Sequence, residues 1–138
     1  MITSLRAQLY RDEGVRLKPY KDSEGLLTIG VGRCLDRVGI TMGESELMLD
    51  NDISRTTADV ITHIPWSYEL DEIRRAVLVN MAFNVGIAGL LKFERMLAAL
   101  KARGYETAAK EMLDSKWRKQ VGVRAERLAK QMVTGEWV

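Results

Sequence analysis

One short segment rich in glycine and β-forming residues interrupts a chain whose apolar periodicity is otherwise helical. Between residues 16 and 36, Pro19 and Gly25 punctuate the sequence, and Leu26–Val31 has the composition of a strand. The preceding Asp22–Gly25 stretch is a favourable turn, because Asp, Ser and Gly all suit turn positions. We therefore predict one small antiparallel sheet within these residues.

Two helices are predicted to flank this sheet. The first covers residues 3–12, with Gly14 as a plausible C-cap. The second should cover about 42–61, since Thr41 and Glu44 form a capping-box pattern at its start. Its middle is too polar to be buried on all sides, which suits a connector between two lobes.

The remainder of the chain, after Pro65, has helical periodicity throughout. Helices are expected at about 71–84, 89–102, 106–114 and 123–133, with breaks at Gly86, Gly89, Gly104, Gly122 and Gly135. The predicted fold is α+β and mainly helical, with two lobes in a single domain, 1–138. The β lobe covers about 14–41, the connecting helix about 42–61, and the helical lobe about 1–12 plus 65–138.

Charge and cysteine content narrow the class of protein. Lys and Arg number 21 against 19 Asp and Glu, a net charge of +2, which is low for a nucleic-acid binder but still favours an anionic polymer. The only cysteine, Cys34, cannot form an internal disulfide, which fits a reducing cytoplasm.

Residues 1–14 contain Arg6 and Arg11 and no uninterrupted apolar stretch, so we expect no signal peptide. We also expect no segment long and apolar enough to span a membrane.

Glu13, Asp22 and Thr28 are the candidate catalytic residues. Breaking a glycosidic bond takes one carboxyl group that donates a proton and one carboxylate that stabilises charge or activates water. Glu13 at a helix end and Asp22 in a turn occupy different environments, which can separate their pKa values. The Thr28 hydroxyl could lie near Asp22 across the turn and help to hold a water, while Gly30 and Gly32 allow close approach. Spacing alone leaves open that the two acids are simply solvated.

The order of these residues resembles the phage-type lysozyme family, the endolysins similar to the T-even phage enzyme. The family pattern is E-G, then R/L-x-x-Y-x-D, then G-x-x-T-I-G-x-G, and it is matched within "DEGVRLKPYKDSEGLLTIGVG". "DEIRRAVLVNMAFNVG" resembles the family's central helix, and residues 95–137 resemble its C-terminal helices. The resemblance covers nearly the whole chain.

This resemblance implies a role for each matching residue. Glu13 would be the general acid, and Asp22 with Thr28 would hold the water that attacks the anomeric carbon. The family inverts configuration, which goes with carboxyl groups about 6.5–9.5 Å apart. Arg124 matches an arginine that pairs with the catalytic glutamate. Asn84 would either hydrogen-bond an N-acetyl group or backbone across the cleft, or cap a helix.

The sequence also departs from the family pattern. Where the T-even enzyme has a histidine after G-x-G, this chain has Arg33, and Asp52 occupies the place of that histidine's aspartate partner. We predict an ion pair between Arg33 and Asp52 at the lobe junction. The chain is also shorter than the T-even enzyme, around residues 34–44.

Several conspicuous residues are expected to be structural. His63 and Cys34 belong to no metal or nucleophile pattern, so we expect no metal site and no cofactor. Met81, Met96, Met112 and Met132 are expected in the core. Trp117 and Trp137 should pack the helical lobe, and Trp66 has no assigned role.

The leading functional hypothesis is an endolysin that hydrolyses the β-1,4 bond between N-acetylmuramic acid and N-acetylglucosamine in peptidoglycan. The alternatives are a lytic transglycosylase, a non-catalytic wall-binding module, and a helical DNA-binding protein. Thr28 beside Asp22 disfavours the transglycosylase, and the glycine-rich β segment has no role in a DNA-binding protein. We expect a monomer, without nucleic acid or stable membrane insertion, which stays in the host cytoplasm until a holin-type pore releases it.

Overall fold

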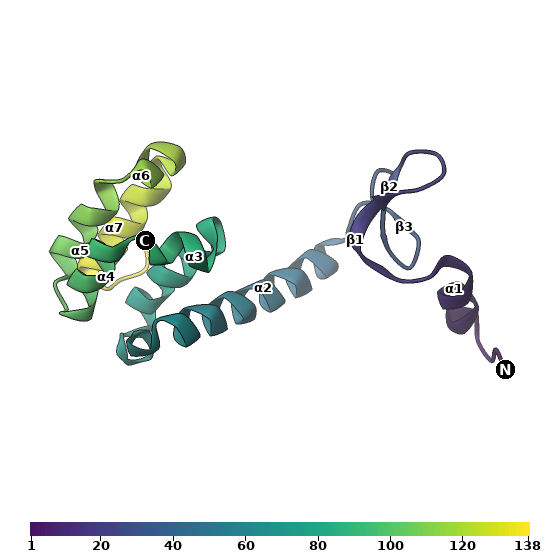
Figure 1. Ribbon diagram of the computed structural model, residues 1–138, viewed down its shortest axis with the longest axis horizontal. Coiled ribbons are helices and arrows are strands. Elements are labelled where there is room, and N and C mark those ends of the chain that lie inside the picture. The colour runs from purple at the N-terminus through teal and green to yellow at the C-terminus, as the bar shows by residue number, and fades with distance from the viewer. The chain divides into compact units, whose positions relative to one another are not determined.

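The computed structural model describes all residues from Met1 to Val138 and divides into two compact units. One unit is Met1–Met48 and the other is Leu49–Val138. The first contains helix α1 and strands β1 to β3, and the second contains helices α3 to α7 (Figure 1). Helix α2 contributes its first turns to one unit and the remainder to the other. The fold class is α+β and mainly helical, as predicted.

Helix α1, Leu5–Glu13, has well-formed caps at both ends. The Ser4 side chain accepts a hydrogen bond from the backbone N–H of Ala7 at 3.1 Å, which satisfies one free donor of the first turn. Gly14 ends the helix with φ +70°, a conformation that glycine adopts without strain. The predicted C-cap is therefore confirmed. The assignment of residues 1–12 to the helical lobe concerns contact between the units and stays a prediction.

The predicted antiparallel sheet is confirmed. Its strands are β1, Arg16–Lys21, β2, Leu27–Gly30, and β3, Arg33–Cys34, in the order β1-β2-β3. Thr28 lies at the centre, opposite Tyr20 on β1 and Cys34 on β3. The central strand therefore places Thr28 where it is only 4% exposed.

Helix α2, Met42–His63, begins at the predicted capping box. The Thr41 hydroxyl accepts from the backbone N–H of Glu44 at 3.1 Å, and the Glu44 carboxylate accepts from the backbone N–H of Thr41 at 2.9 Å. Its buried residues, Thr56 and Val60, lie one turn apart on one face.

The second unit is entirely helical beyond α2. Its elements are the 3₁₀-helix η1, Pro65–Glu69, and helices α3, Glu72–Leu91, α4, Glu94–Lys101, α5, Tyr105–Leu113, α6, Lys116–Val121, and α7, Val123–Thr134. The sequence analysis missed η1 and α6, which are too short to show a periodic apolar face. The signal for α6 is its N-cap, Ser115, whose hydroxyl accepts from the backbone N–H of Arg118 at 3.2 Å.

Helix α3 is interrupted where one of the predicted breaks lies. Gly86 has non-helical angles, φ 77° and ψ 164°, so the helix kinks there. The predicted break at Gly89 is wrong, because the helix continues to Leu91.

The expectation that no segment has the length and composition of a membrane span is also wrong, since Glu72–Leu91 has both. Length and composition do not by themselves make a membrane span, because core helices share them, and Val77, Leu78 and Met81 of α3 are buried in the unit's core.

The core of the second unit consists mainly of apolar side chains from its α-helices, α2 to α7. The members are Val60, Ile64, Leu70, Val77, Leu78, Met81, Ala82, Leu90, Met96, Leu100, Ala108, Ala109, Met112, Trp117, Ala125, Leu128, Ala129 and Met132. The four methionines and Trp117 are thus buried as predicted, and Trp66 packs against this core partly buried. The prediction for Trp137 is wrong. It is 64% exposed, because α7 ends at Thr134 with Gly135 as a left-handed C-cap, and Trp137 lies beyond that cap.

Candidate active site

Glu13 is the last residue of α1, and its carboxyl group lies against the backbone of Gly32. A Cβ atom on Gly32 would be 2.8 Å from Glu13 Oε2 and 2.9 Å from its Cδ. Gly32 also has φ +66°, a left-handed conformation that strains any other residue. The left-handed φ favours glycine at this position, and the close approach shows that the Glu13 carboxyl group lies directly on the Gly32 backbone.

Asp22 is half-buried in the turn between β1 and β2, and its carboxylate organises that turn. Asp22 Oδ1 accepts hydrogen bonds from the backbone N–H groups of Glu24 at 2.8 Å and Leu26 at 3.0 Å. The backbone of the turn closes through Asp22 N to Leu26 O at 2.9 Å and Gly25 N to Asp22 O at 3.0 Å. These bonds fix one carboxylate oxygen, and the other, Oδ2, takes no part in the turn.

Thr28 is bonded to the same peptide segment as Asp22. Its hydroxyl donates to the carbonyl oxygen of Leu26 at 3.1 Å, and Leu26 donates its N–H to Asp22. Leu26 therefore links the two side chains that the sequence analysis assigned to one water. Because the Thr28 hydroxyl uses its proton on the carbonyl, its lone pairs remain for accepting from a water.

Gly30 ends β2 opposite Arg16 and has φ +69°. No atom lies within 4 Å of where its Cβ would be, so the backbone there faces open space. That Gly30 lets a ligand approach closely stays a prediction.

Arg33 and Asp52 each have an ion-pair partner within their own unit. Arg33 Nη1 donates to Glu44 Oε1 at 2.6 Å and to the carbonyl oxygen of Gly39 at 3.3 Å. Asp52 pairs with Arg55 at 2.9 Å, one turn along α2. A pair between Arg33 and Asp52 would join the two units and stays a prediction.

The Arg33–Glu44 pair shifts the titration of both partners. The hydrogen bond from Arg33, together with the backbone hydrogen bond from Thr41, lowers the pKa of Glu44 from 4.5 to about 2. The hydrogen bond and charge of Glu44 raise the pKa of Arg33 above its usual value. The carboxylate is therefore ionised across the physiological range. The sequence predicted Glu44 only as the N3 residue of a capping box, and its ion pair with Arg33 was not predicted.

Two further predicted residues, Asn84 and Arg124, lie in the second unit. Asn84 Oδ1 accepts a hydrogen bond from the indole nitrogen of Trp117 at 2.9 Å, so the side chain has a partner on α6. Arg124 donates from Nε and Nη2 to Asn80 Oδ1, at 3.1 and 2.8 Å. Asn80 was not identified from sequence. The expected pairing of Arg124 with Glu13 concerns both units and stays a prediction.

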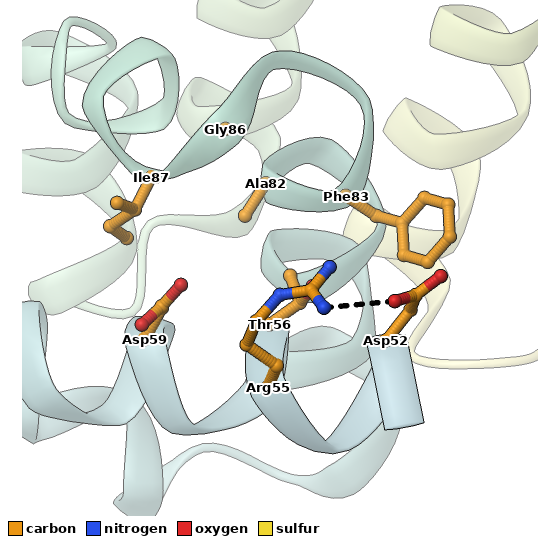
Figure 2. Close-up of a pocket in the computed structure, with 8 residues that line it drawn as sticks. All are labelled: Asp52, Arg55, Thr56, Asp59, Ala82, Phe83, Gly86 and Ile87. Atoms are coloured by element: carbon orange, nitrogen blue, oxygen red, sulfur yellow. Dashed lines mark ion pairs between the residues drawn. The ribbon is translucent and has the colours of Figure 1, made fainter. Parts of the chain in front are cut away.

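Asp52 and Trp117 each line a cavity of the second unit. One, of about 280 Å³, lies between α2 and the kink of α3, and Figure 2 shows the Asp52–Arg55 ion pair on one side with Phe83 and Ile87 on the other. The larger, of about 640 Å³, is lined by Trp117 and Phe93 together with side chains of both charges, Lys92, Glu94, Arg95, Glu111, Asp114 and Lys116. The structure contains no cluster of three or more His, Cys, Asp or Glu side chains that could hold a metal ion.

Comparison with known proteins places the chain among lysozymes. The phage lysozyme family model matches residues 10–132. The probable T4-type lysozyme 1 of Dictyostelium discoideum is 30% identical, over 98% of this chain and 96% of the relative. The endolysin of Salmonella phage P22 is 30% identical, over 77% of this chain and 76% of the relative. The pre-baseplate central spike protein Gp5 of Enterobacteria phage T4 is 33% identical over 96% of this chain, which spans only 28% of the spike protein. The family match covers the strands, the turn at Asp22 and most of the helical unit. The chain belongs to the phage lysozyme family.

Proposed function

We propose that this protein is a muramidase that hydrolyses the β-1,4 bond between N-acetylmuramic acid and N-acetylglucosamine in peptidoglycan. The observation that carries the proposal is the arrangement of Asp22 and Thr28 about Leu26, beside a β-turn, in a chain of the phage lysozyme family. The names of its relatives, lysozyme and endolysin, support the same class of reaction.

In the proposed mechanism, Glu13 donates its proton to the glycosidic oxygen as the bond to the anomeric carbon breaks. A water that hydrogen-bonds Asp22 and Thr28 attacks the anomeric carbon from the opposite face, and its proton passes to the carboxylate of Asp22. The products are one chain with a new reducing end and one with a free hydroxyl group. Direct attack by water inverts the configuration at the anomeric carbon.

Asp22 suits the role of base because its turn holds the carboxylate in place without consuming both oxygens. Oδ1 is bound by the backbone of Glu24 and Leu26, which leaves Oδ2 for water. A transglycosylase has no use for such a water, since its acceptor is a hydroxyl of the substrate itself. We therefore favour hydrolysis.

The test is the loss of turbidity of permeabilised Gram-negative cells, followed by mass analysis of the released fragments. Wild type should clear the suspension and release fragments with reducing ends, whereas Glu13→Gln and Asp22→Asn should clear it at least about a hundredfold more slowly. Anhydro ends would identify a transglycosylase. A folded wild type that binds walls without clearing them would identify a wall-binding module.

We further propose that the enzyme is a monomer that stays in the host cytoplasm until a holin-type pore opens. The single cysteine, Cys34, is compatible with a reducing compartment. Cells that make the protein alone should retain the lytic activity until a pore-forming agent is added. Activity in the medium of intact cells would contradict this route.

A further inference from the structure

The backbone beneath Glu13 is intrinsically permissive. Gly30 and Gly32 both have left-handed φ angles, +69° and +66°, and only Val31 separates them. Glycine has the widest choice of backbone conformations. The φ and ψ preferences of Gly30 and Gly32 therefore do not by themselves fix the conformation of this turn. The carboxyl group of Glu13 lies on this turn, with Oε2 2.8 Å from the position of a Gly32 Cβ. A shift of Gly32 would therefore move the surface on which Glu13 rests.

The strand that follows Gly32 is too short to fix the turn alone. Strand β3 contains only Arg33 and Cys34, whose partners on β2 are Ile29 and Thr28. A pair of residues contributes little ladder stability. Side-chain contacts from outside the sheet must therefore supply much of the constraint.

Asp36 supplies one such contact, accepting from the backbone N–H of Leu27 at 2.7 Å, and Glu44 supplies the one nearest to Gly32 along the chain. Arg33, directly after Gly32, donates to Glu44 Oε1 at 2.6 Å, and the same oxygen accepts from the backbone N–H of Thr41 at 2.9 Å. Arg33 also donates to the carbonyl oxygen of Gly39 at 3.3 Å. The Arg33–Glu44 pair thus connects β3, the loop around Gly39 and the first turn of α2. Arg33 and Glu44 are only partly exposed, at 35% and 40% of their side chains.

We infer that Glu44 is a positioning residue for the reaction, acting through Arg33 and Gly32 on the carboxyl group of Glu13. The inference rests on the proposed function, since it concerns the general acid of that reaction. Glu44 does not touch the reacting atoms in this account. It fixes the backbone against which the acid is aligned, and catalysis is sensitive to small displacements of such groups.

The test compares variants that remove the ion pair with one that weakens only the helix cap. Arg33→Met and Glu44→Ala both remove the pair, and Arg33→Met leaves the capping box intact. Thr41→Ala removes the hydroxyl that accepts from the backbone of Glu44 and leaves the pair in place. For each folded variant, kcat and KM on soluble peptidoglycan fragments are measured together with the thermal unfolding midpoint.

We expect Arg33→Met and Glu44→Ala each to lower kcat by about five- to tenfold, with KM changed less than about twofold. The double variant should be no slower than either single variant, because both act through one contact. Thr41→Ala should lower the unfolding midpoint and keep kcat within about twofold of wild type.

A wild-type kcat in folded Glu44→Ala would overturn the inference, as would an equal fall of kcat in Thr41→Ala, which would show a general effect of stability. Effects of Arg33→Met and Glu44→Ala that multiply in the double variant would overturn it too. These outcomes all presuppose an active wild type. A wild type that releases no reducing ends instead counts against the proposed function.

Discussion

At the residue scale, Leu26 connects the two side chains assigned to the attacking water through its backbone N–H and its carbonyl oxygen. Asp22 accepts the N–H of Leu26, and Thr28 donates to its carbonyl oxygen. Asp22 and Thr28, six positions apart in sequence, thus share Leu26 as a hydrogen-bond partner. Both hydrogen bonds come from local turn and strand structure within the first unit.

Thr28→Val tests the hydroxyl directly. Valine has nearly the same shape, so it should fill this buried position, but it cannot hydrogen-bond a water. We expect kcat to fall by about a hundredfold, and Thr28→Ser, which keeps the hydroxyl, to remain within about tenfold of wild type. Steady-state kinetics on soluble fragments, with circular dichroism as the check on folding, measures this. Equal rates for the valine and serine variants would contradict the assignment.

The local structure around the candidate catalytic residues was partly predictable from the sequence. Asp22 in a turn and Thr28 in a strand follow from local preferences, which act over a few residues. The contact of Glu13 with Gly32 and the choice of Glu44 as the partner of Arg33 were not predicted. Both depend on how a loop folds back on itself, and neither propensity nor periodicity specifies that.

At the scale of elements, the start of α2 is more than a helix cap. The Thr41–Glu44 box was predicted from its pattern, and the structure adds Arg33 to the same carboxylate. In the helical unit, the long helices were predictable because an apolar stripe repeats over several turns. Helix α6 was not, because six residues are too few to establish such a stripe.

The low pKa of Glu44 makes a prediction about acid stability. A carboxyl group whose pKa falls from 4.5 to about 2 on folding stabilises the native state above pH 4.5. This contribution is lost as the pH falls from 4.5 towards 2. Glu44→Gln keeps the capping box but cannot ionise. The difference in unfolding midpoint between wild type and Glu44→Gln should be largest above pH 5 and shrink steadily below it. A difference that stays constant down to pH 2 would contradict this account.

Arg74 makes a second prediction at this scale, because it ties α3 to the end of α7. It donates from Nε to the carbonyl oxygen of Met132 at 2.7 Å and from Nη2 to that of Val133 at 2.8 Å, and it stacks on Tyr105 at 3.5 Å. Arg74→Ala leaves these carbonyl groups without their charged donor.

We expect Arg74→Ala to lower the free energy of unfolding by about 1.5–3 kcal/mol, measured by urea denaturation. Arg127→Ala is the matched control, since Arg127 is an exposed arginine on α7, and it should change stability by less than about 0.5 kcal/mol. Equal losses in both variants would show that Arg74 has no special role.

At the scale of the whole molecule, the charge is small but unevenly distributed along the chain. The net charge is only +2, yet the last helices carry Lys116, Arg118, Lys119, Arg124, Arg127 and Lys130. A cationic segment of this kind attracts an anionic cell wall over a distance set by the ionic strength. This attraction should therefore speed the hydrolysis of anionic cell walls and have little influence on the hydrolysis of an uncharged substrate.

Salt provides the corresponding prediction. Raising the ionic strength from about 0.05 to 0.3 M shortens the screening length from roughly 14 to 6 Å, and clearing of whole walls should slow several-fold. Hydrolysis of a neutral N-acetylglucosamine oligosaccharide should change less than about twofold over the same range. An equal slowing on both substrates would show that salt acts on the enzyme itself.

The central claim is that a water held by Asp22 and Thr28 attacks the anomeric carbon directly while Glu13 protonates the leaving oxygen. Proton NMR of the first product formed, before mutarotation, tests it most directly on a soluble muropeptide. The account predicts that the α-anomer of N-acetylmuramic acid appears first and that Asp22→Asn and Thr28→Val suppress its formation. Initial release of the β-anomer, or of an anhydro sugar without a reducing end, would contradict it.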